Sequence, residues 1–589
     1  MIALNKLKKV TKPARYIGGE YNSIIKQNYE MRFCFAFPDL YEIGMANLGL
    51  KIIYDLLNKR EDTWCERCFA PYVDMEKILR ENNQKLFALE SRDSLDKFDI
   101  IGFTLQYEMS YTNILNMLNL SEIPVHRKDR KNDFPFIVAG GAGAFNPYPL
   151  SQFIDIFMVG DGEEILNVLM DKYKQFKNSN REKSYFYELL KNEEGFYIPH
   201  IHTKKDIIKR QIIHNMDNII YPTNPIVPST AITQDRISLE IFRGCSRGCR
   251  FCQAGFVYRP VREKSIETIV NNAIDTIKNT GNNELSLSSL STTDYSKFIE
   301  LASSILEIEN DKKVSFSLPS LRIDSMNVDI LTKLKSVRKS TLTFAIEAGS
   351  QRLRNVINKN ITKEDILNTV DLAIDNGWTS FKLYFMLGLP TEDFDDVNEI
   401  VNITNDIIKR GKERNKKLSI SMSTSVFVPK PHTPFMWCKF DNFDIIDLKQ
   451  KLLKEKLNRK YIKYSYHDAK LSMLEALVSR GDEKIGDLIY RAYKYGAKFD
   501  SHEDIFDFEI WEKAIYYEKI DLNKYIYTNY DLDYEFCFDN IHTGVTKEFL
   551  KREYTKAMEG KNTNNCMKTC NNCGIEKCKL RGKHYASVK

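Results

Sequence analysis

The chain has 589 residues, of which 43% are hydrophobic and 28% charged, and this length is enough for about three or four domains with substantial cores. A formal net charge of +6, from 86 basic and 80 acidic residues, is too small over this length to predict a nucleic-acid-binding protein. The amino terminus lacks the apolar core of a signal peptide, and no run of 18 apolar residues could cross a membrane. We therefore expect a cytoplasmic protein whose 12 cysteines are reduced thiols or cluster ligands rather than disulfides.

Residues 1–180 are predicted to form a Rossmann-like domain. After an irregular lead-in, the chain from Arg32 onward has the pattern of a strand, a loop with glycines and an amphipathic helix. Further strands are expected at 65–71, 86–90, 99–105, 136–139 and 154–159. Such alternation of strands and helices favours an open, mostly parallel sheet with a ligand crevice at the carboxyl ends of its strands.

Three loops follow these predicted strands, at 38–44, 106–111 and 140–149. Their glycines, Gly140 and Gly141 among them, would let the phosphate or ring of a ligand approach the backbone closely. A tight turn explains a single glycine-rich loop equally well, so the residues leave both interpretations open.

The region after the first domain predicts a barrel. Residues 181–236 are expected to connect the two, and residues 237–440 repeat strand–helix units. Strands are predicted at 238–242, 284–288, 314–317, 341–346, 380–386 and 418–428, and helices at 266–279, 295–308, 327–334, 363–376 and 394–410. Six such units indicate a partial (β/α)6 barrel with its chemistry at the carboxyl ends of the strands. Residues 441–589 are expected to be mostly helical with a cysteine-rich tail, so the predicted fold class is α/β.

Three cysteines directly follow the first barrel strand. Cys245, Cys249 and Cys252 have the spacing C-x3-C-x2-C. Three thiolates on one tight loop can ligate three corners of a cubane iron–sulfur cluster and leave the fourth iron open. Small and basic residues between the cysteines would let the backbone wrap closely and would offset the negative charge of a cluster. A zinc loop is the weaker interpretation, because zinc sites usually pair C-x2-C with a second, distant pair.

With the aromatic Phe251 just before its third cysteine, this loop resembles the radical S-adenosylmethionine superfamily, in which the open iron chelates the cofactor's amino and carboxylate groups. The resemblance implies a 4Fe–4S cluster that passes one electron into S-adenosylmethionine. Homolysis then gives methionine and a 5′-deoxyadenosyl radical, which abstracts hydrogen from an unactivated carbon. It also implies a flavodoxin- or ferredoxin-type reductant as partner.

The ends of the second and third strands supply candidate contacts for S-adenosylmethionine. Where the superfamily often has Gly-Gly-Glu, this chain has Ser289, Ser291 and Asp294, whose oxygens can accept hydrogen bonds from an ammonium group. Arg322, after the third strand, could pair bidentately with the methionine carboxylate or form an ordinary surface salt bridge.

The fourth and fifth strands end in further candidates. In the family, the position of Glu347 binds ribose hydroxyls, and a carboxylate at the end of an apolar strand is costly without a partner. Arg354 follows in the same pattern, and Gly388 lies in a bend that resembles the backbone cradle for adenine. The resemblance therefore implies that all three, and Phe251 of the cysteine loop, are cofactor-binding residues.

The order of domains is similar to the cobalamin-binding class of the superfamily. The segments AGGAGAFNPYP, FMVGDGEE and PKPHTPF resemble that class, which usually lacks the D-x-H-x-x-G motif, as this chain does. The resemblance implies bound cobalamin, held in part by Gly140 and Gly141, and methylation of an unactivated carbon as in many members. His432 in the last segment either faces substrate or cobalamin or packs as an ordinary core histidine.

The tail contains a second cysteine motif, formed by Cys566, Cys570, Cys573 and Cys578. Four thiolates could close a second 4Fe–4S cluster or a structural zinc site, and the spacing does not choose between them. The remaining cysteines are expected to be small buried hydrophobes: Cys34, Cys65, Cys68, Cys438 and Cys537. Cys65 and Cys68 would point to opposite faces of one strand, which argues against a chelate.

Other functions stay open at this point. A radical rearrangement or cyclisation with cobalamin is one, and methylthiolation-type sulfur insertion from the tail cluster is another. A non-catalytic cobalamin or redox sensor would use the same domains for binding only. An RNA base is a candidate substrate because a basic, cysteine-rich tail could dock RNA, although the near-neutral charge gives little support.

Overall fold

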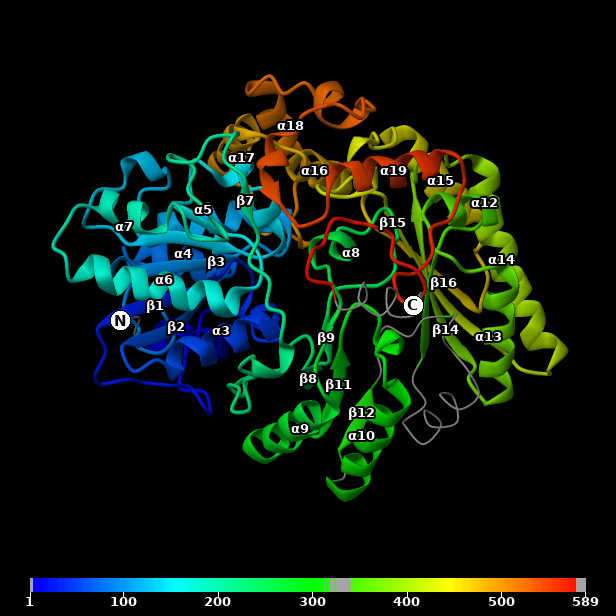
Figure 1. Cartoon of the computed structure of the whole chain (residues 1–589), viewed down its shortest axis with the longest axis horizontal. Coiled ribbons are helices and arrows are strands. Elements are labelled where there is room, and N and C mark those ends of the chain that lie inside the picture. The colour runs from blue at the N-terminus through cyan, green and yellow to red at the C-terminus, as the bar shows by residue number, and fades with distance from the viewer. Residues whose placement is uncertain (1–3, 313, 318–322, 324–340, 579–589) are drawn as a thin grey trace.

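The structure is a computed structural model that describes residues 4–312, 314–317, 323 and 341–578. The N-terminal sheet and the barrel strands lie side by side, and the C-terminal helices lie across the top of both (Figure 1). These helices are α16 (Ala469–Ser479), α17 (Glu483–Tyr495), α18 (Phe508–Tyr517) and α19 (Lys547–Met558). The α/β fold class predicted from the sequence is confirmed.

The N-terminal sheet has six strands in the order β2-β1-β3-β4-β5-β6. They are β1 (Met31–Phe37), β2 (Thr63–Phe69), β3 (Ile100–Thr104), β4 (Phe136–Gly140), β5 (Ile156–Met158) and β6 (Phe196–Tyr197). All neighbours pair in parallel except β5 and β6, which are antiparallel. This is the doubly wound order in which the chain direction across the sheet reverses between β1 and β3.

One predicted strand of this domain, at 86–90, is wrong. Within it, Phe87 makes only an isolated antiparallel bridge to Ser94. The Ala88 N–H donates to the Asp93 carbonyl at 2.9 Å, and the Leu89 N–H donates to the Arg67 carbonyl at 2.8 Å. Leu86, Ala88 and Leu89 are buried, so their pattern suggests a strand, but the backbone forms one bond within a local turn and one to β2 rather than a ladder.

Helices cover both faces of this sheet. One face packs on α3 (Leu48–Lys59), α6 (Gly162–Lys177) and α7 (Lys183–Leu190), and the other on α4 (Val73–Glu81) and α5 (Tyr111–Leu120). Cys65 packs on the first face and Cys68 on the second, as expected for positions three apart on a strand. The second face shares one continuous apolar core with the barrel strands and with α16 and α17.

The barrel region forms two parallel sheets. One has the order β12-β11-β8, from β8 (Ile237–Glu240), β11 (Glu284–Ser288) and β12 (Ser315–Ser317). The other has the order β13-β14-β15-β16, from β13 (Leu342–Glu347), β14 (Ser380–Leu387), β15 (Ser419–Val426) and β16 (Ile462–Tyr466). All six predicted strands therefore form. β16 is an addition in a region predicted to be helical, where Ile462, Tyr464 and Tyr466 alternate as in a strand.

Helices lie on the outside of these strands (Figure 1). They are α9 (Ile266–Thr280), α10 (Phe298–Lys312), α12 (Gln351–Val356), α13 (Lys363–Asp375), α14 (Phe394–Glu413) and α15 (Phe443–Lys456). The helix predicted at 327–334 and the candidate residue Arg322 lie outside the described residues. No helix in the described ranges is long and apolar enough to cross a membrane.

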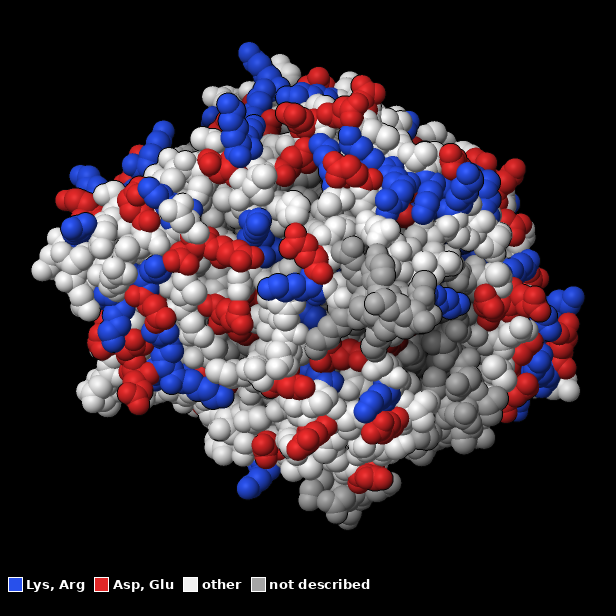
Figure 2. Space-filling view, viewed as in Figure 1, with Lys and Arg blue, Asp and Glu red and all other residues white. Residues whose placement is uncertain are grey.

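Charged side chains of both signs are interspersed over most of the visible surface, with basic side chains gathered near α19 (Figure 2). That helix carries Lys547, Lys551, Arg552 and Lys556. Part of this charge is paired, since Lys551 Nζ lies 2.6 Å from Asp533 and Lys547 Nζ lies 2.6 Å from Asp539. The surface therefore shows no large field of a single sign on this face.

Candidate functional site

The cysteine loop, residues 244–261, leaves and re-enters the barrel through a short antiparallel pair. β9 (Phe242–Arg243) precedes the loop and β10 (Arg262–Glu263) follows it, with Arg243 opposite Arg262. Gly244 begins the loop with φ of 85°, and a Cβ there would lie 2.3 Å from the Pro260 carbonyl oxygen. Only glycine fits at this position. The loop, with the short helix α8 (Ala254–Val257), lies beside the carboxyl ends of β8 and β11, near the centre of the molecule (Figure 1).

The three thiols of this loop lie close enough to affect one another. Burial, and next the Cys249 thiol, raise the pKa of Cys245 to about 11 and that of Cys252 to about 12. Free thiols with such pKa values stay protonated at neutral pH, whereas a bound metal holds the thiolate form. Within the described ranges, no three His, Cys, Asp or Glu side chains are gathered tightly enough to hold a metal ion. By its chemistry, the donor set of three thiols on one loop is the set that would ligate three corners of an iron–sulfur cluster.

The basic residues of the loop fix it in place. Arg250 is fully buried and donates to the carbonyls of Asn355, Val356 and Lys561 at 3.1, 2.9 and 2.7 Å. It also pairs with Glu553 of α19 at 3.2 Å. The sequence predicted that these residues offset cluster charge. In the structure, Arg250 joins the cysteine loop to the barrel and to α19, and its offset of cluster charge stays a prediction.

The segment after β11 is bonded to the same loop. Arg247 Nε donates to Asp294 Oδ2 at 2.8 Å, and Ser291 Oγ donates to the same oxygen at 2.7 Å. Ser289 Oγ lies 3.1 Å from Thr292 Oγ1. The structure therefore brings Ser289, Ser291 and Asp294 together beside the cysteines. Their contact with S-adenosylmethionine stays a prediction.

Glu347 ends β13 in a strained backbone. Its φ is 70°, in the left-handed region, and the pairing of β13 with β14 is irregular at this residue. Lys359 Nζ lies 3.2 Å from Glu347 Oε1, and Glu347 is one of the charges that raise the pKa of Cys252. Glu347 therefore lies near the cysteine loop. Such strain in a non-glycine residue is typical of functional sites.

Three other candidates support the loops around Glu347. Arg354 donates to the carbonyls of Ala348 and Gly349 at 3.1 and 2.6 Å, just after β13. Phe251 packs against the apolar cluster that contains Ala348 and residues of α12. Gly388, with φ of 78°, donates its N–H to Glu392 Oε1 at 2.7 Å. Cofactor contact by each of the three stays a prediction.

A cavity of about 370 Å³ lies where the N-terminal domain meets the ends of the barrel strands. It is lined by Gly160 and Glu163 of the loop after β5, and by Glu240, Ser288, Ser289 and Tyr258 of the barrel. Arg243 also lines it and pairs with Asp161 at 3.3 Å, with Glu163, and with Glu240 at 2.8 Å. Sequence reasoning missed Arg243, although its place directly before the cysteine loop was a signal that it could join the two domains.

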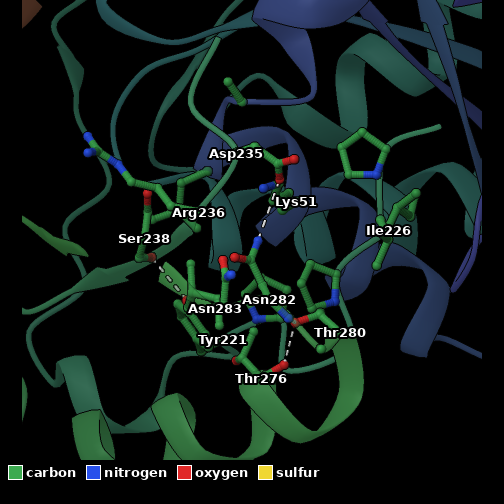
Figure 3. Close-up of a pocket in the computed structure, with 18 residues that line it drawn as sticks. Lys51, Tyr221, Ile226, Asp235, Arg236, Ser238, Thr276, Thr280, Asn282 and Asn283 are labelled. Carbon is green, nitrogen blue, oxygen red and sulfur yellow. Dashed lines mark hydrogen bonds between the residues drawn. The ribbon is translucent and has the colours of Figure 1, made fainter. Parts of the chain in front are cut away.

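A second cavity, of about 320 Å³, lies at the opposite end of the barrel (Figure 3). Lys51 of α3 and Asp235 lie close together in it, and burial lowers the pKa of Lys51. Tyr221 Oη donates to the Ser238 carbonyl at 3.0 Å, at the amino-terminal end of β8. Since the cysteines follow the carboxyl end of β8, this cavity is not part of their site.

The glycines of the loop after β4 serve close packing within the N-terminal domain. A Cβ on Gly141 would lie 3.0 Å from the Leu105 carbonyl oxygen, and one on Gly143 would lie 2.3 Å from Tyr111 Oη. Asn146 Nδ2 donates to the carbonyls of Ser479 and Gly481, both at 2.9 Å. The loop that carries Gly140 and Gly141 is therefore held between the loop after β3 and the turn between α16 and α17.

The crevice between β1 and β3 is filled by residues 499–502 of the C-terminal region. Asn113 Nδ2 donates to the Pro38 carbonyl at 2.9 Å, which bridges the segments that follow the two strands. The Phe499 N–H donates to Asn113 Oδ1 at 2.8 Å, and His502 Nε2 lies 2.8 Å from Asp39 Oδ1. A doubly wound sheet binds its ligand at this point. Residues 499–502 therefore contact both sides of this crevice, and cobalamin binding by the N-terminal domain stays a prediction.

His432 packs as a core histidine. Its Nε2–H donates to the Phe145 carbonyl at 2.8 Å, and its ring meets Phe145 and Phe538 edge to face. Burial lowers the pKa of His432 to about 4, so the ring is neutral at physiological pH. Of the two interpretations of this residue, the structure supports packing.

The tail cysteines lie next to the cysteine loop. The Cys566 N–H donates to the Ser246 carbonyl at 2.9 Å, between the first and second cysteines of the loop. All four tail cysteines are half-buried. Neither the tail nor the cysteine loop forms a disulfide in the described part of the chain. Metal binding by Cys566, Cys570, Cys573 and Cys578 stays a prediction.

Comparison with known proteins identifies the family. The family model described as the radical SAM superfamily matches residues 239–403, and one described as radical SAM proteins, N-terminal, matches residues 49–199. An uncharacterized protein of Methanocaldococcus jannaschii is 30% identical over 455 residues, which cover 76% of this chain and 88% of that protein. A second protein of that organism, provisionally named a methylthiotransferase, is 25% identical over 62% of this chain and 73% of its own length.

Two solved structures have a similar arrangement. The methyltransferase TsrM from Kitasatospora setae, solved with cobalamin and a [4Fe–4S] cluster, has 13% sequence identity and a TM-score of 0.48 over 67% of this chain and 75% of that one. OxsB, a cobalamin-dependent S-adenosylmethionine radical enzyme, has 13% identity and a TM-score of 0.48 over 90% of this chain and 79% of that one. From the family matches and the Methanocaldococcus relative, this chain belongs to the radical S-adenosylmethionine superfamily, and it carries that superfamily's N-terminal domain.

Proposed function

We propose that this radical S-adenosylmethionine enzyme cleaves its cofactor reductively to a 5′-deoxyadenosyl radical, and that the radical abstracts hydrogen from an unactivated carbon that is then methylated. The observation that carries the proposal is the meeting of three features. The cysteine loop, the strained Glu347 and the cavity of about 370 Å³ all lie at the carboxyl ends of the barrel strands.

Each group of candidate residues has its own proposed role. Cys245, Cys249 and Cys252 would hold the cluster, which supplies one electron to S-adenosylmethionine when it is bound. The Glu347 carboxylate, held toward the cysteine loop by Lys359, would accept hydrogen bonds from the ribose hydroxyls. The hydroxyl oxygens of Ser289 and Ser291 would accept from the ammonium group of the methionine part.

Cobalamin as the methyl carrier is supported by the sequence resemblance. Residues 499–502 contact both sides of the crevice between β1 and β3, so the test of cobalamin binding is separate from the test of the radical step. A flavodoxin- or ferredoxin-type protein is the proposed electron donor, and the substrate, RNA included, is not assigned by any contact described above.

The test is an anaerobic assay of the reconstituted full chain with S-adenosylmethionine and a reductant. We expect 5′-deoxyadenosine to form, and to fall to background in Cys249→Ala but not in the control Cys537→Ala. Iron and cobalt are counted in the same sample. If a fully loaded cluster gives no 5′-deoxyadenosine even with cell extract as a source of substrate, the radical proposal fails and the redox or cobalamin sensor becomes the better hypothesis.

Labelled methyl groups separate the remaining reactions. S-adenosylmethionine carrying a deuterated methyl group should transfer that label to a carbon of the product. A product that also carries sulfur would instead support methylthiolation, the second candidate. That candidate is favoured by the relative provisionally named a methylthiotransferase and by the four cysteines beside the cluster loop. A product without the label would support rearrangement or cyclisation.

A further inference from the structure

The tail that carries four cysteines, residues 566–578, is held against the cysteine loop although it has no helix or strand. The Cys566 N–H donates to the Ser246 carbonyl of that loop at 2.9 Å. The Thr546 N–H, at the start of α19, donates to the Cys573 carbonyl at 3.0 Å, and Arg552 Nη2 donates to the Asn571 carbonyl at 2.5 Å. The backbone of the tail is therefore held at the first and third cysteines of its motif.

The tail thiols share one electrostatic environment. Burial raises the pKa of Cys566, and the Cys573 and Cys578 thiols act in the same direction. The Arg259 guanidinium acts in the opposite direction on the same thiol. Arg259 Nη2 and the Cys566 N–H donate to the adjacent carbonyls of Arg247 and Ser246, so Arg259 lies beside the tail. Cys570 lies between Cys566 and Cys573 in the sequence.

Two deeply buried arginines lie at this place. Arg259 is 3% exposed and Arg210 is 2% exposed. Among the described residues, Arg259 Nη1 and both Nε and Nη2 of Arg210 have no hydrogen-bond partner. Arg259 donates its other hydrogens to the carbonyls of Gly255 and Arg247 at 2.9 and 3.0 Å, and Arg210 Nη1 donates to the Val257 carbonyl. In the part of the chain that the structure describes, neither guanidinium is bonded to a carboxylate.

This arrangement is costly unless negative charge is supplied. A buried charge without a counter-charge costs several kcal/mol, and each unpaired buried N–H adds to that cost. Burial lowers the pKa of Arg210 to about 10, and Asp161 and Cys573 are among the groups that oppose this change. Asp161 already binds Arg243 and Arg262. Neutral thiols cannot balance the two guanidinium groups, whereas thiolates can.

We infer that Cys566, Cys570, Cys573 and Cys578 ligate a second metal centre of net negative charge, with Arg259 and Arg210 as its buried counter-cations. One divalent zinc ion with four thiolates carries a net charge of about −2, and an oxidised four-iron cluster with four thiolates has a similar charge. Either centre would balance the positive charge of the same two arginines. The inference is therefore a metal centre with four thiolate ligands, of either kind. The inference does not depend on which reaction the enzyme catalyses.

The second centre would also support the first. Arg259 Nη2 donates to the Arg247 carbonyl at 3.0 Å, and Cys245 is one of the thiols that raise the pKa of Arg259. Arg259 therefore lies between the two cysteine motifs and interacts with both. Since Cys566 is itself bonded to Ser246, loss of the tail metal should loosen the loop that carries the radical cluster.

The test is a metal count on the full chain. The protein is reconstituted anaerobically with iron and sulfide, with and without added zinc, and iron, sulfide and zinc are measured by mass spectrometry. A second iron–sulfur cluster gives about eight irons per chain, and a zinc site gives about four irons and one zinc. The inference is wrong if the wild-type chain holds about four irons and no zinc. Cleavage of S-adenosylmethionine by such a sample would leave the proposed function standing.

Cysteine variants assign the metal to its ligands. A variant with alanine at Cys245, Cys249 and Cys252 should keep the tail metal, and one with alanine at all four tail cysteines should lose it. Cys537→Ala, a cysteine in neither motif, should keep both. The inference is wrong if the four-cysteine variant keeps the full wild-type complement. Circular dichroism establishes that each variant is folded before its metals are counted.

Arginine variants test the counter-cations. Arg259→Gln should release the tail metal to a chelator about 10- to 100-fold faster, as for other groups that support metal ligands, and Arg259→Lys should restore part of the retention. Arg480→Gln is the matched control. Arg480 is buried, and it donates to the carbonyls of Met436 and Cys438 at 3.3 and 2.8 Å and to that of Tyr525. Equal release rates in the two glutamine variants would rule out the role of Arg259.

Discussion

The carboxyl ends of the two sets of parallel strands have opposite surroundings. At the N-terminal sheet, the segments after β1 and β3 are joined by Asn113 and covered by residues 499–502. At the barrel, the ends of β8, β11 and β13 carry the cysteine loop, the strained Glu347 and a cavity of about 370 Å³. Both edges have the topology at which α/β proteins bind ligands, but only the second has space and unusual chemistry together.

This difference shows why glycine-rich loops are weak evidence for a ligand. Glycine is needed at positions 141 and 143 because a Cβ on either residue would lie too close to Leu105 or Tyr111, near the loop after β3. Gly244 is likewise required by Pro260. In each case the neighbouring backbone or side chain explains the glycine without any bound group. What distinguishes the barrel edge is the cysteines, the positive φ at Glu347 and the ion pairs of Arg243.

The largest expected effect concerns the support of the barrel edge by α19. Arg250→Met would remove the fully buried cation that pairs with Glu553 and leave that carboxylate with Lys556 and Thr563. We expect the free energy of unfolding to fall by up to about 3–5 kcal/mol. The matched control is Arg236→Met, whose partly exposed partner Glu284 lies 3.6 Å away at the amino-terminal end of the barrel. It should cost less than about 1 kcal/mol. Urea denaturation followed by circular dichroism measures both, and equal losses would show that α19 does not support the cysteine loop.

The next effect concerns the segment that fills the N-terminal crevice. Asp500 is 2% exposed and accepts hydrogen bonds from Thr112 Oγ1 at 2.6 Å and Trp511 Nε1 at 2.8 Å. Burial raises its pKa from 3.8 to about 6. Because the folded state favours the protonated carboxyl, this contribution to stability is complete below pH 3.8 and is lost as the pH rises through about 6. The loss is at most about 3 kcal/mol.

Asp500→Asn should remove that dependence. We expect the difference in unfolding free energy between pH 5 and pH 8 to shrink in the variant, measured by urea denaturation. His502 contributes in the same direction, since Asp39 raises its pKa, so His502→Gln is measured in parallel. If the unfolding free energy of Asp500→Asn depends on pH as that of the wild type does, Asp500 is not the source of the dependence. If the wild-type chain binds cobalamin at pH 8 and not at pH 5, residues 499–502 leave the crevice as the pH rises. The two edges would then differ only at low pH.

The sequence predicted the elements better than their long-range contacts. Each buried barrel strand has its own apolar pattern, and the spacing of Cys245, Cys249 and Cys252 is local, so both can be read from a short window. The filling of the crevice joins Asn113 to Phe499, which lie 386 residues apart. No periodicity in a single sequence links two such positions. The sequence therefore predicted a ligand crevice that the C-terminal region fills.

The burial of several arginines was also not predicted from the sequence. Arg210, Arg250 and Arg259 look like surface residues in the sequence, because arginine is mostly exposed in proteins. Their burial follows from carbonyls and thiols supplied by distant segments, such as Lys561 for Arg250 and Cys566 for Arg259. The sequence predicted the tail cysteines as metal ligands, but it gave no sign of the charge arranged around them.

The smallest expected effect tests whether Glu347, at the barrel edge, binds the cofactor. Glu347→Gln keeps the shape of the side chain but removes the charge that faces Lys359. A hydrogen bond from a ribose hydroxyl to a charged carboxylate contributes about 2 kcal/mol, so cleavage of S-adenosylmethionine should slow about 30-fold. Glu263→Gln is the control, because Glu263 lies on β10 and accepts from the Ser296 N–H at 2.8 Å. If Glu347→Gln cleaves the cofactor at the wild-type rate with an unchanged KM, the strained carboxylate supports only the cysteine loop, and the ribose must be bound elsewhere.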